Sequence, residues 1–234
     1  MIIKIVLKLI HFLKRILGIN CSEQEISDVG IFNSQITTEE YQKAISFFTV
    51  SFKFFSLVQN SLQETIFQKN RYFVTSDKEI DFDEYASATK WSDRQIIIPL
   101  LFNFYHGLEL FLKGLLHFDP SFELKAKHSI AGLSDRFIKN NLSEKELCDF
   151  LKKYIHFGKL PELLKDFLTI NNLTINKLYE ALRYPTDPSF TLIREYLCFK
   201  YKGDEGIHFF EELLSDIEKA RIAAVSYAKA RKPG

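Results

Sequence analysis

The feature that most constrains the fold is the amphipathic stretch from Pro99 to His117, PLLFNFYHGLELFLKGLLH. On a helix of 3.6 residues per turn, its large apolar residues share one wide face. These residues are Leu100, Leu101, Phe104, Tyr105, Leu108, Phe111, Leu112 and Leu115. The stretch therefore predicts a helix that buries this face in a hydrophobic core.

A polar strip lies on the opposite side of this predicted helix. It contains Asn103, His106, Glu109 and Lys113, with Gly107 and Gly114 at its edge. Glu109 and Lys113 have the i,i+4 spacing and the order that favour an ion pair. Each glycine costs about 1 kcal/mol relative to alanine inside a helix, which close approach of another helix or a ligand would explain. The strip is either a structural ion pair between helices or part of a functional groove.

The rest of the chain also favours helices. Glycine and proline are scarce, at 9 and 6 copies, whereas β-sandwiches and barrels need many turns built from them. Apolar periodicity, capping boxes at Thr37–Glu40 and Ser143–Glu146, and helix-breaking residues together define the expected helices. Their ranges are 38–69, 93–117, 129–140, 144–157, 161–169, 175–183 and 207–231, with a further helical segment near 189–201. We therefore expect an all-α protein.

Two features interrupt this pattern. Residues 70–92 lose the helical period, and the acidic run 77–84 is expected to be a solvated loop. Pro99 is expected to interrupt the helix that begins near Asp93, so that its regular part starts with proline in the first turn.

Charge and cysteine content exclude several classes of protein. The net charge is +1, so a nucleic acid or an anionic membrane would have to be held by a local patch. Three widely separated cysteines without Cys/His ligand spacing predict reduced thiols, a cytoplasmic location and no metal site. Phosphate-loop, dinucleotide-binding, zinc-protease and nucleophile-elbow motifs are missing from the sequence, and no cofactor is expected.

Residues 2–17, IIKIVLKLIHFLKRIL, form a basic amphipathic segment. Lys4, Lys8, His11 and Arg15 would fall within a helical stripe about 60° wide. The segment is too short and too charged for a transmembrane span, and its charges are not placed as in a secretory signal. Two interpretations remain: a helix in the membrane interface, or a helix docked into the protein's own core or onto a partner.

Four further residues are candidates for ligand binding. They are Lys127, His128, Arg183 and Tyr184. A histidine at a helix start, such as His128, can equally be a cap or a surface residue. A guanidinium beside a Tyr-Pro loop suits a carboxylate or a phosphate, although Arg183 could instead pair with Glu180 or Asp187.

Several pieces of the chain, in their order, resemble the HEPN domain of prokaryotes. They are PLLFNFYHGLELFLKGLL, KAKHSIAGLSDRF, LYEALRYP and a long C-terminal helix, within about residues 93–231. The residues that match the family's motifs are Glu109 and Lys113, His128 with Lys127 in place of the usual small residue, and Arg183, Tyr184 and Pro185. The resemblance implies an antiparallel helical bundle over 93–234. From their own residue patterns, a basic amphipathic helix is expected over 1–20, and a helical extension with a long aromatic-rich helix and a loop over 21–92.

This resemblance implies RNA- or nucleotide-related roles, often in toxin–antitoxin and antiviral defence systems, and commonly a homodimer or a protein partner. Ribonucleases of the family carry Arg-x(4–6)-His, and no arginine here has a histidine at that distance downstream. From Arg183, the histidine position falls on Pro188, Ser189 or Phe190. The first hypothesis is therefore a protein of a defence or stress system that binds RNA, a nucleotide or a protein without a standard nuclease centre.

Two alternatives stay open. One is a diverged, metal-independent ribonuclease, and the other is a membrane-peripheral interaction protein that uses residues 2–17. The candidate ribonuclease site consists of His106, Glu109, Lys113, His128 and Arg183. We expect these five side chains to converge on one groove, since two or three cations with one carboxylate suit a phosphate.

Deleting residues 1–18 is expected to leave a folded protein and to remove any association with membranes or a partner. The reason is that a capping box at Ser22–Glu25 provides a new helix start after the basic segment. A circular-dichroism melt and flotation with anionic liposomes measure the two effects. An unfolded truncated protein would instead assign the segment to the core.

Overall fold

The computed structural model describes residues 36–74, 79–122 and 129–233. Within these ranges the chain forms helices and a single isolated β-bridge, between Thr186 and Ile193, and no strand. The helices are α2 (Thr38–Phe67), α3 (Phe82–Thr89), α4 (Asp93–Leu116), α5 (Ile130–Asn140), α6 (Lys145–Ile155), η1 (Phe157–Lys159), α7 (Glu162–Ile170), α8 (Ile175–Arg183), η2 (Leu197–Phe199) and α9 (Gly203–Ala230). The all-α prediction is confirmed.

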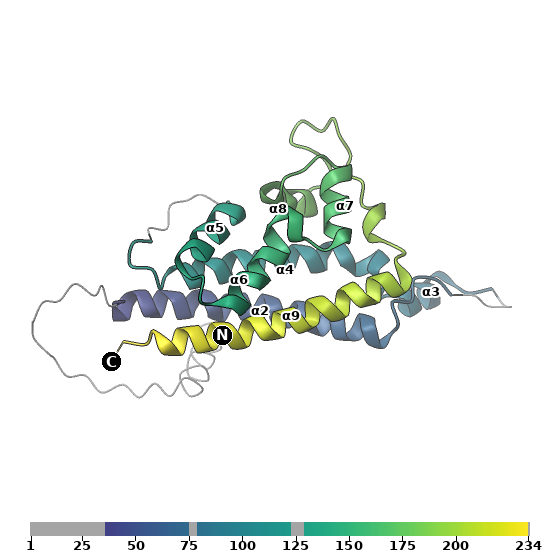
Figure 1. Ribbon diagram of the computed structural model, residues 1–234. Coiled ribbons are helices and arrows are strands. Elements are labelled where there is room, and N and C mark those ends of the chain that lie inside the picture. Colours follow the sequence, from purple (N-terminus) through teal and green to yellow (C-terminus); the bar gives the residue numbers. More distant parts are fainter. Residues whose placement is uncertain (1–35, 75–78, 123–128, 234) are drawn as a thin grey trace, which may run out of the picture.

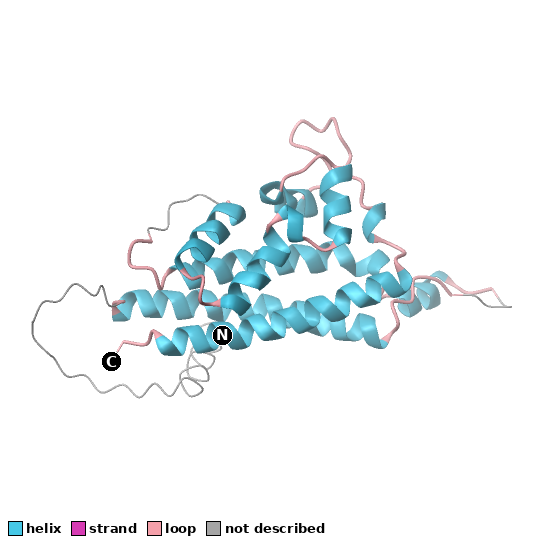
Figure 2. Ribbon diagram, in the orientation of Figure 1, coloured by secondary structure: helices cyan, strands magenta, loops and turns pink. Residues whose placement is uncertain are grey.

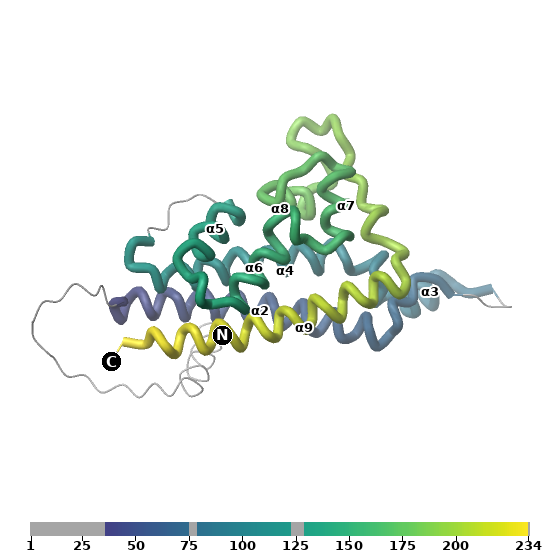
Figure 3. The backbone as a smooth tube through the Cα atoms, in the orientation of Figure 1, coloured from purple at the N-terminus to yellow at the C-terminus, as the bar shows by residue number. Residues whose placement is uncertain are grey.

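The three longest described helices lie along one another, and the shorter ones cover one side of them (Figure 1). α2 packs most extensively against α4 and also against α9, which runs in the opposite direction to α2. Helices α5 to α8 lie on the other side of α4 (Figure 2), and the backbone trace shows α4 between the two groups (Figure 3). α4 is therefore the central helix.

Close packing of α2 on α4 depends on the two glycines of α4. A Cβ atom at Gly114 would lie 2.7 Å from Cδ1 of Phe48, and one at Gly107 would lie 3.0 Å from the Phe55 ring. The Ser51 hydroxyl donates a hydrogen bond of 2.8 Å to the Gly107 carbonyl oxygen. The glycines therefore serve the approach of another helix, the first of the two explanations expected from the sequence.

The wide apolar face predicted for α4 is buried. All eight of its apolar residues named above belong to the core, together with residues from α2, α6 and α9. Phenylalanines fill much of the centre, where the rings of Phe55, Phe104, Phe111 and Phe150 contact one another. This core contains residues from both sides of residue 92, the boundary expected between the helical extension and the bundle.

A buried carboxylate joins the starts of α4 and α9 to the end of α2. The Asp93 carboxylate accepts hydrogen bonds from Asn70 Nδ2 at 3.0 Å, Tyr201 N at 3.0 Å and Lys202 N at 2.7 Å. The Asp93 amide donates to Asn70 Oδ1 at 2.6 Å. Because these hydrogen bonds replace those that water would make, the Asp93 carboxylate can be buried at this junction.

Among the described helices, α4 alone is long and apolar enough to cross a membrane by length and composition. Half of its most apolar 18-residue stretch is buried inside the protein. A central core helix meets the same criterion, and α4 occupies that position here.

Local predictions hold at some helix ends and are wrong at others. The capping box is present at Thr37, whose hydroxyl accepts from Glu40 N at 3.2 Å while its amide donates to the Glu40 carboxylate at 2.9 Å. At α6 the expected box is wrong, because Glu144 is the N-cap and makes no side-chain cap hydrogen bond. Glu144 instead contacts Arg231, the C-cap of α9, at 3.3 Å.

α4 continues through Pro99, which corrects the expected interruption. Proline cannot donate to the carbonyl of Gln95, four residues earlier. Both Pro99 and Gln95 are exposed, so water can hydrate that carbonyl, while burial of Leu100 and Leu101 holds the helix together.

Two predicted segments also differ in type. α3 occupies part of the range expected to be a loop, and Asp81 caps it by accepting from Glu84 N at 2.8 Å. The helix expected near 189–201 is a loop apart from η2. In that loop the Asp187 carboxylate accepts hydrogen bonds from backbone amides, which compete with helix formation.

Replacing Gly114 with alanine is expected to destabilise the protein by about 1–2 kcal/mol. Overpacking against Phe48 costs about 1–3 kcal/mol, and the better helix propensity of alanine offsets up to about 1 kcal/mol. Urea unfolding of Gly114→Ala and the parent measures the difference. Gly158→Ala is the control, because a Cβ there would meet no atom within 4 Å apart from Gly158 itself and its two chain neighbours. Equal losses in both variants would contradict the proposed role of Gly114.

Candidate functional site

A pocket of about 510 Å³ lies between α4, α8 and the start of α5. Its polar and aromatic lining residues are Tyr105, His106, Glu109, Lys113, Asn176, Tyr179, Glu180, Arg183 and Tyr184, and its aliphatic ones are Leu110, Ile130 and Ile175. The volume is within the range of about 300–1,000 Å³ that is typical of small-molecule sites. The lining combines an apolar wall with a few charged groups, as such sites do.

The structure brings four of the five predicted groove residues to this pocket. His106, Glu109 and Lys113 come from α4, and Arg183 ends α8, followed directly by Tyr184. The remaining candidates, which are Lys127, His128, Lys4, Lys8, His11 and Arg15, lie outside the described residues. That the pocket is a functional site stays a prediction.

Asn176 fixes the position of α8 relative to α5. Its side-chain oxygen accepts from Ala131 N at 3.1 Å and lies 3.4 Å from the Ser129 hydroxyl. Ser129 in turn caps α5 by accepting from Gly132 N at 3.1 Å. The two helix starts that border the pocket are therefore joined by one side chain.

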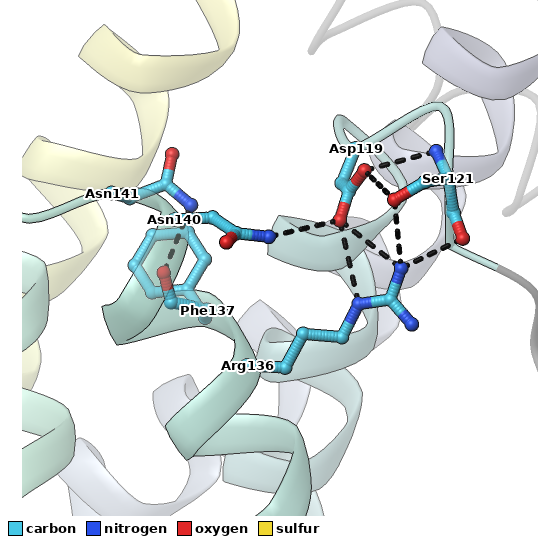
Figure 4. Close-up of polar contacts among 6 residues, drawn as sticks. All are labelled: Asp119, Ser121, Arg136, Phe137, Asn140 and Asn141. Carbon is cyan, nitrogen blue, oxygen red and sulfur yellow. Dashed lines mark hydrogen bonds and ion pairs between the residues drawn. The ribbon is translucent and has the colours of Figure 1, made fainter.

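A second polar network holds α5 against the segment that follows α4 (Figure 4). Arg136 donates to the Ser121 carbonyl oxygen at 2.7 Å and pairs with Asp119 at 3.2 Å. Asn140 of the same helix lies 3.4 Å from the Asp119 carboxylate. These contacts secure the α5 wall of the pocket.

The charged side chains of the pocket differ in whether they form an ion pair. Glu109 and Lys113 form an ion pair of 2.6 Å, with only 14% and 13% of their side chains exposed. Glu180 pairs with Lys177 at 2.8 Å. In the described part of the chain, no carboxylate lies within ion-pairing distance of Arg183, whose guanidinium sits 5.0 Å from the centre of the Tyr184 ring. The expected alternative, in which Arg183 pairs with Glu180 or Asp187, is therefore wrong.

His106 is enclosed by aromatic rings. Its ring centroid is 4.5 Å from that of Phe54, and its Nδ1 atom lies 3.5 Å from the Tyr179 hydroxyl. Burial lowers the pKa of His106 below its ordinary value of 6.5, and this effect outweighs the opposite influence of Glu109. His106 is therefore neutral at pH 7 and can either donate or accept a hydrogen bond.

The α8 residues that face the pocket before Arg183 were not among the residues predicted from the sequence. Ile175 and Tyr179 precede Arg183 by eight and four residues, so they share its side of the helix. Tyr179 also stacks on Phe102 with centroids 4.9 Å apart. The i,i+4 spacing was available as a signal in the sequence, but the pairing of α8 with α4 was not.

Comparisons with known proteins found no match to a family model, a curated protein or a solved structure. The resemblance to the HEPN domain therefore rests on the sequence motifs alone. In the described residues, no group of three His, Cys, Asp or Glu side chains is arranged to hold a metal ion.

Lowering the pH through 6.5 is expected to destabilise the parent protein more than a His106→Gln variant. The unfolded chain binds a proton near the ordinary histidine pKa of 6.5, whereas the folded chain does so only at lower pH. His106 therefore contributes stability above pH 6.5 that is lost as the pH falls. Urea unfolding on both sides of pH 6.5 measures this slope. Since burial also lowers the pKa of His117, the comparison is between the two proteins; equal slopes would contradict the assignment to His106.

Proposed function

We propose that the pocket between α4, α5 and α8 binds a phosphate-bearing ligand, specifically a nucleotide or the end of an RNA strand. The observation that carries the proposal is the arrangement of Arg183. Its guanidinium lines the pocket and has no carboxylate partner in the described residues. Lys113 lines the same pocket and adds a second cation. Arginine offers a planar fork of donors that matches a phosphate.

The rest of the lining suits the other part of a nucleotide. Tyr179 and Tyr184 offer aromatic surfaces on which a base could stack, and Leu110, Ile130 and Ile175 supply apolar wall. Neutral His106 and the Tyr179 hydroxyl could hydrogen-bond base or sugar atoms. An anion placed near His106 would favour its protonation, so binding is expected to strengthen as the pH falls.

The motifs that resemble the HEPN domain support the same class of ligand. The same resemblance implies a role in a toxin–antitoxin or antiviral defence system, as a homodimer or with a protein partner. The chain lacks the Arg-x(4–6)-His motif, which favours binding over cleavage. A diverged ribonuclease would use the same pocket, with His106 as its proton-transfer group.

The proposal is tested by calorimetric titration of the full chain with adenosine monophosphate, adenosine, inorganic phosphate and a short single-stranded RNA. We expect a phosphate-bearing nucleotide or the RNA to bind more tightly than adenosine or phosphate. Arg183→Ala should weaken binding about tenfold to a hundredfold, the value of a charge-assisted hydrogen bond. Its melting temperature should change little, because Arg183 is exposed.

Lys229→Ala is the control, since Lys229 is an exposed cation of α9 that does not line the pocket. Its affinity should equal that of the parent. Equal affinity in Arg183→Ala and the parent would reject the proposed site. Incubation of the same preparations with labelled RNA separates the enzymatic alternative, which requires cleavage that His106→Ala abolishes.

A further inference from the structure

The loop between α8 and η2 projects from the molecule (Figure 1) and carries apolar side chains that are mostly exposed. Phe190 is 84% exposed, Leu192 62% and Ile193 85%. Leu197 and Tyr184, at either end of the loop, are also exposed. These residues contribute little to the hydrophobic core, so stability of the fold does not explain their type.

Phe190 is also unfavourable for the backbone conformation that it adopts. Its φ angle is +58°, in the left-handed region that favours glycine or asparagine. This backbone conformation is strained for phenylalanine, and burial of the ring does not compensate for the strain because the ring is exposed. Strain at a loop tip that the fold does not need points to a role outside the chain.

Asp187 holds the tip in this conformation. Its carboxylate accepts from the amides of Ser189 at 3.3 Å, Thr191 at 2.8 Å and Leu192 at 2.7 Å. The Phe190 amide donates to the Asp187 carbonyl oxygen at 3.0 Å. The four amides from 189 to 192 are therefore satisfied within the loop. The Ser189 and Thr191 hydroxyls also donate to the Asp187 carboxylate, and the other exposed side chains of the tip, Phe190, Leu192 and Ile193, are apolar.

We propose that this tip, residues 189–193, inserts into the interface of a lipid bilayer. Amide groups that are already bonded can enter a medium that offers no acceptors, and exposed aromatic and aliphatic side chains gain by leaving water. Three side chains on a projecting tip are too few for a standard protein interface, which takes about 20–30 residues from each partner. Insertion into lipid needs no complementary surface of that size.

The base of the loop carries a cation, Arg194, which is partly exposed and can face the phosphates of lipid headgroups. Arg194 has no carboxylate within ion-pairing distance in the described ranges, and its Nε atom is buried without a hydrogen-bond partner. Glu195 is occupied by the Leu197 amide at 2.6 Å.

Flotation of the full chain with phosphatidylcholine vesicles, with and without phosphatidylglycerol, tests the proposal. The double variant Phe190→Ser/Ile193→Ser should bind vesicles at least about tenfold more weakly than the parent. Ile222→Ser is the control, because Ile222 is an exposed apolar residue of α9, away from the loop. It should bind like the parent. Phe190→Gly should weaken binding without lowering the melting temperature, because glycine suits the +58° conformation.

A Phe190→Trp variant locates the contact, because brominated lipids should quench the added fluorescence. Flotation without this quenching would mean that another segment, such as residues 2–17, makes the contact, and the proposal would fail. It would also fail if the parent does not float, or if the serine variants bind like the parent. A change in oligomeric state with unchanged flotation would assign the loop to contact between copies. None of these outcomes bears on nucleotide binding, which is measured without lipid.

Discussion

The close contact of α2 with α4 determines how the rest of the protein is arranged. Gly107 and Gly114 let α2 lie directly against one side of α4, and the Ser51 hydrogen bond to the Gly107 carbonyl fixes the two helices along their length. With that side and the wide apolar face occupied, the strip that carries His106, Glu109 and Lys113 is left facing α8 and α5. The packing that builds the core therefore also determines which residues line the pocket.

Much of this arrangement could be predicted from the sequence because it is local to α4. Helical spacing alone assigns the apolar face and groups His106 with Glu109 and Lys113. The pairing of this strip with the end of α8 was expected only through the HEPN resemblance, since no local pattern specifies which helices become neighbours. Tyr179 was missed for that reason, although its spacing from Arg183 was visible in the sequence.

The wrong local predictions have a common cause, which is that tertiary or side-chain contacts outweighed local propensity. Pro99 breaks helices in isolation, but burial of its neighbours and exposure of Gln95 let α4 continue. The segment near 189–201 has apolar residues at helical spacing, yet the Asp187 carboxylate takes the amides that a helix would use. Glu144 is held by Arg231, the C-cap of α9, and no pattern in the sequence near Glu144 indicates this contact.

The pocket and the apolar loop meet at the end of α8. The Tyr196 hydroxyl contacts the carbonyl oxygens of Ala181 and Tyr184, and the Arg194 amide donates to the Pro185 carbonyl at 2.8 Å. Asn171, the C-cap of α7, holds the Glu195 backbone from the other side, by hydrogen bonds of 2.8 and 3.0 Å. The base of the loop is therefore joined to α7 and α8 by hydrogen bonds rather than by a free linker. If both proposals hold, a ligand bound at Arg183 is kept at a set distance from the bilayer surface, because one continuous unit carries both contacts.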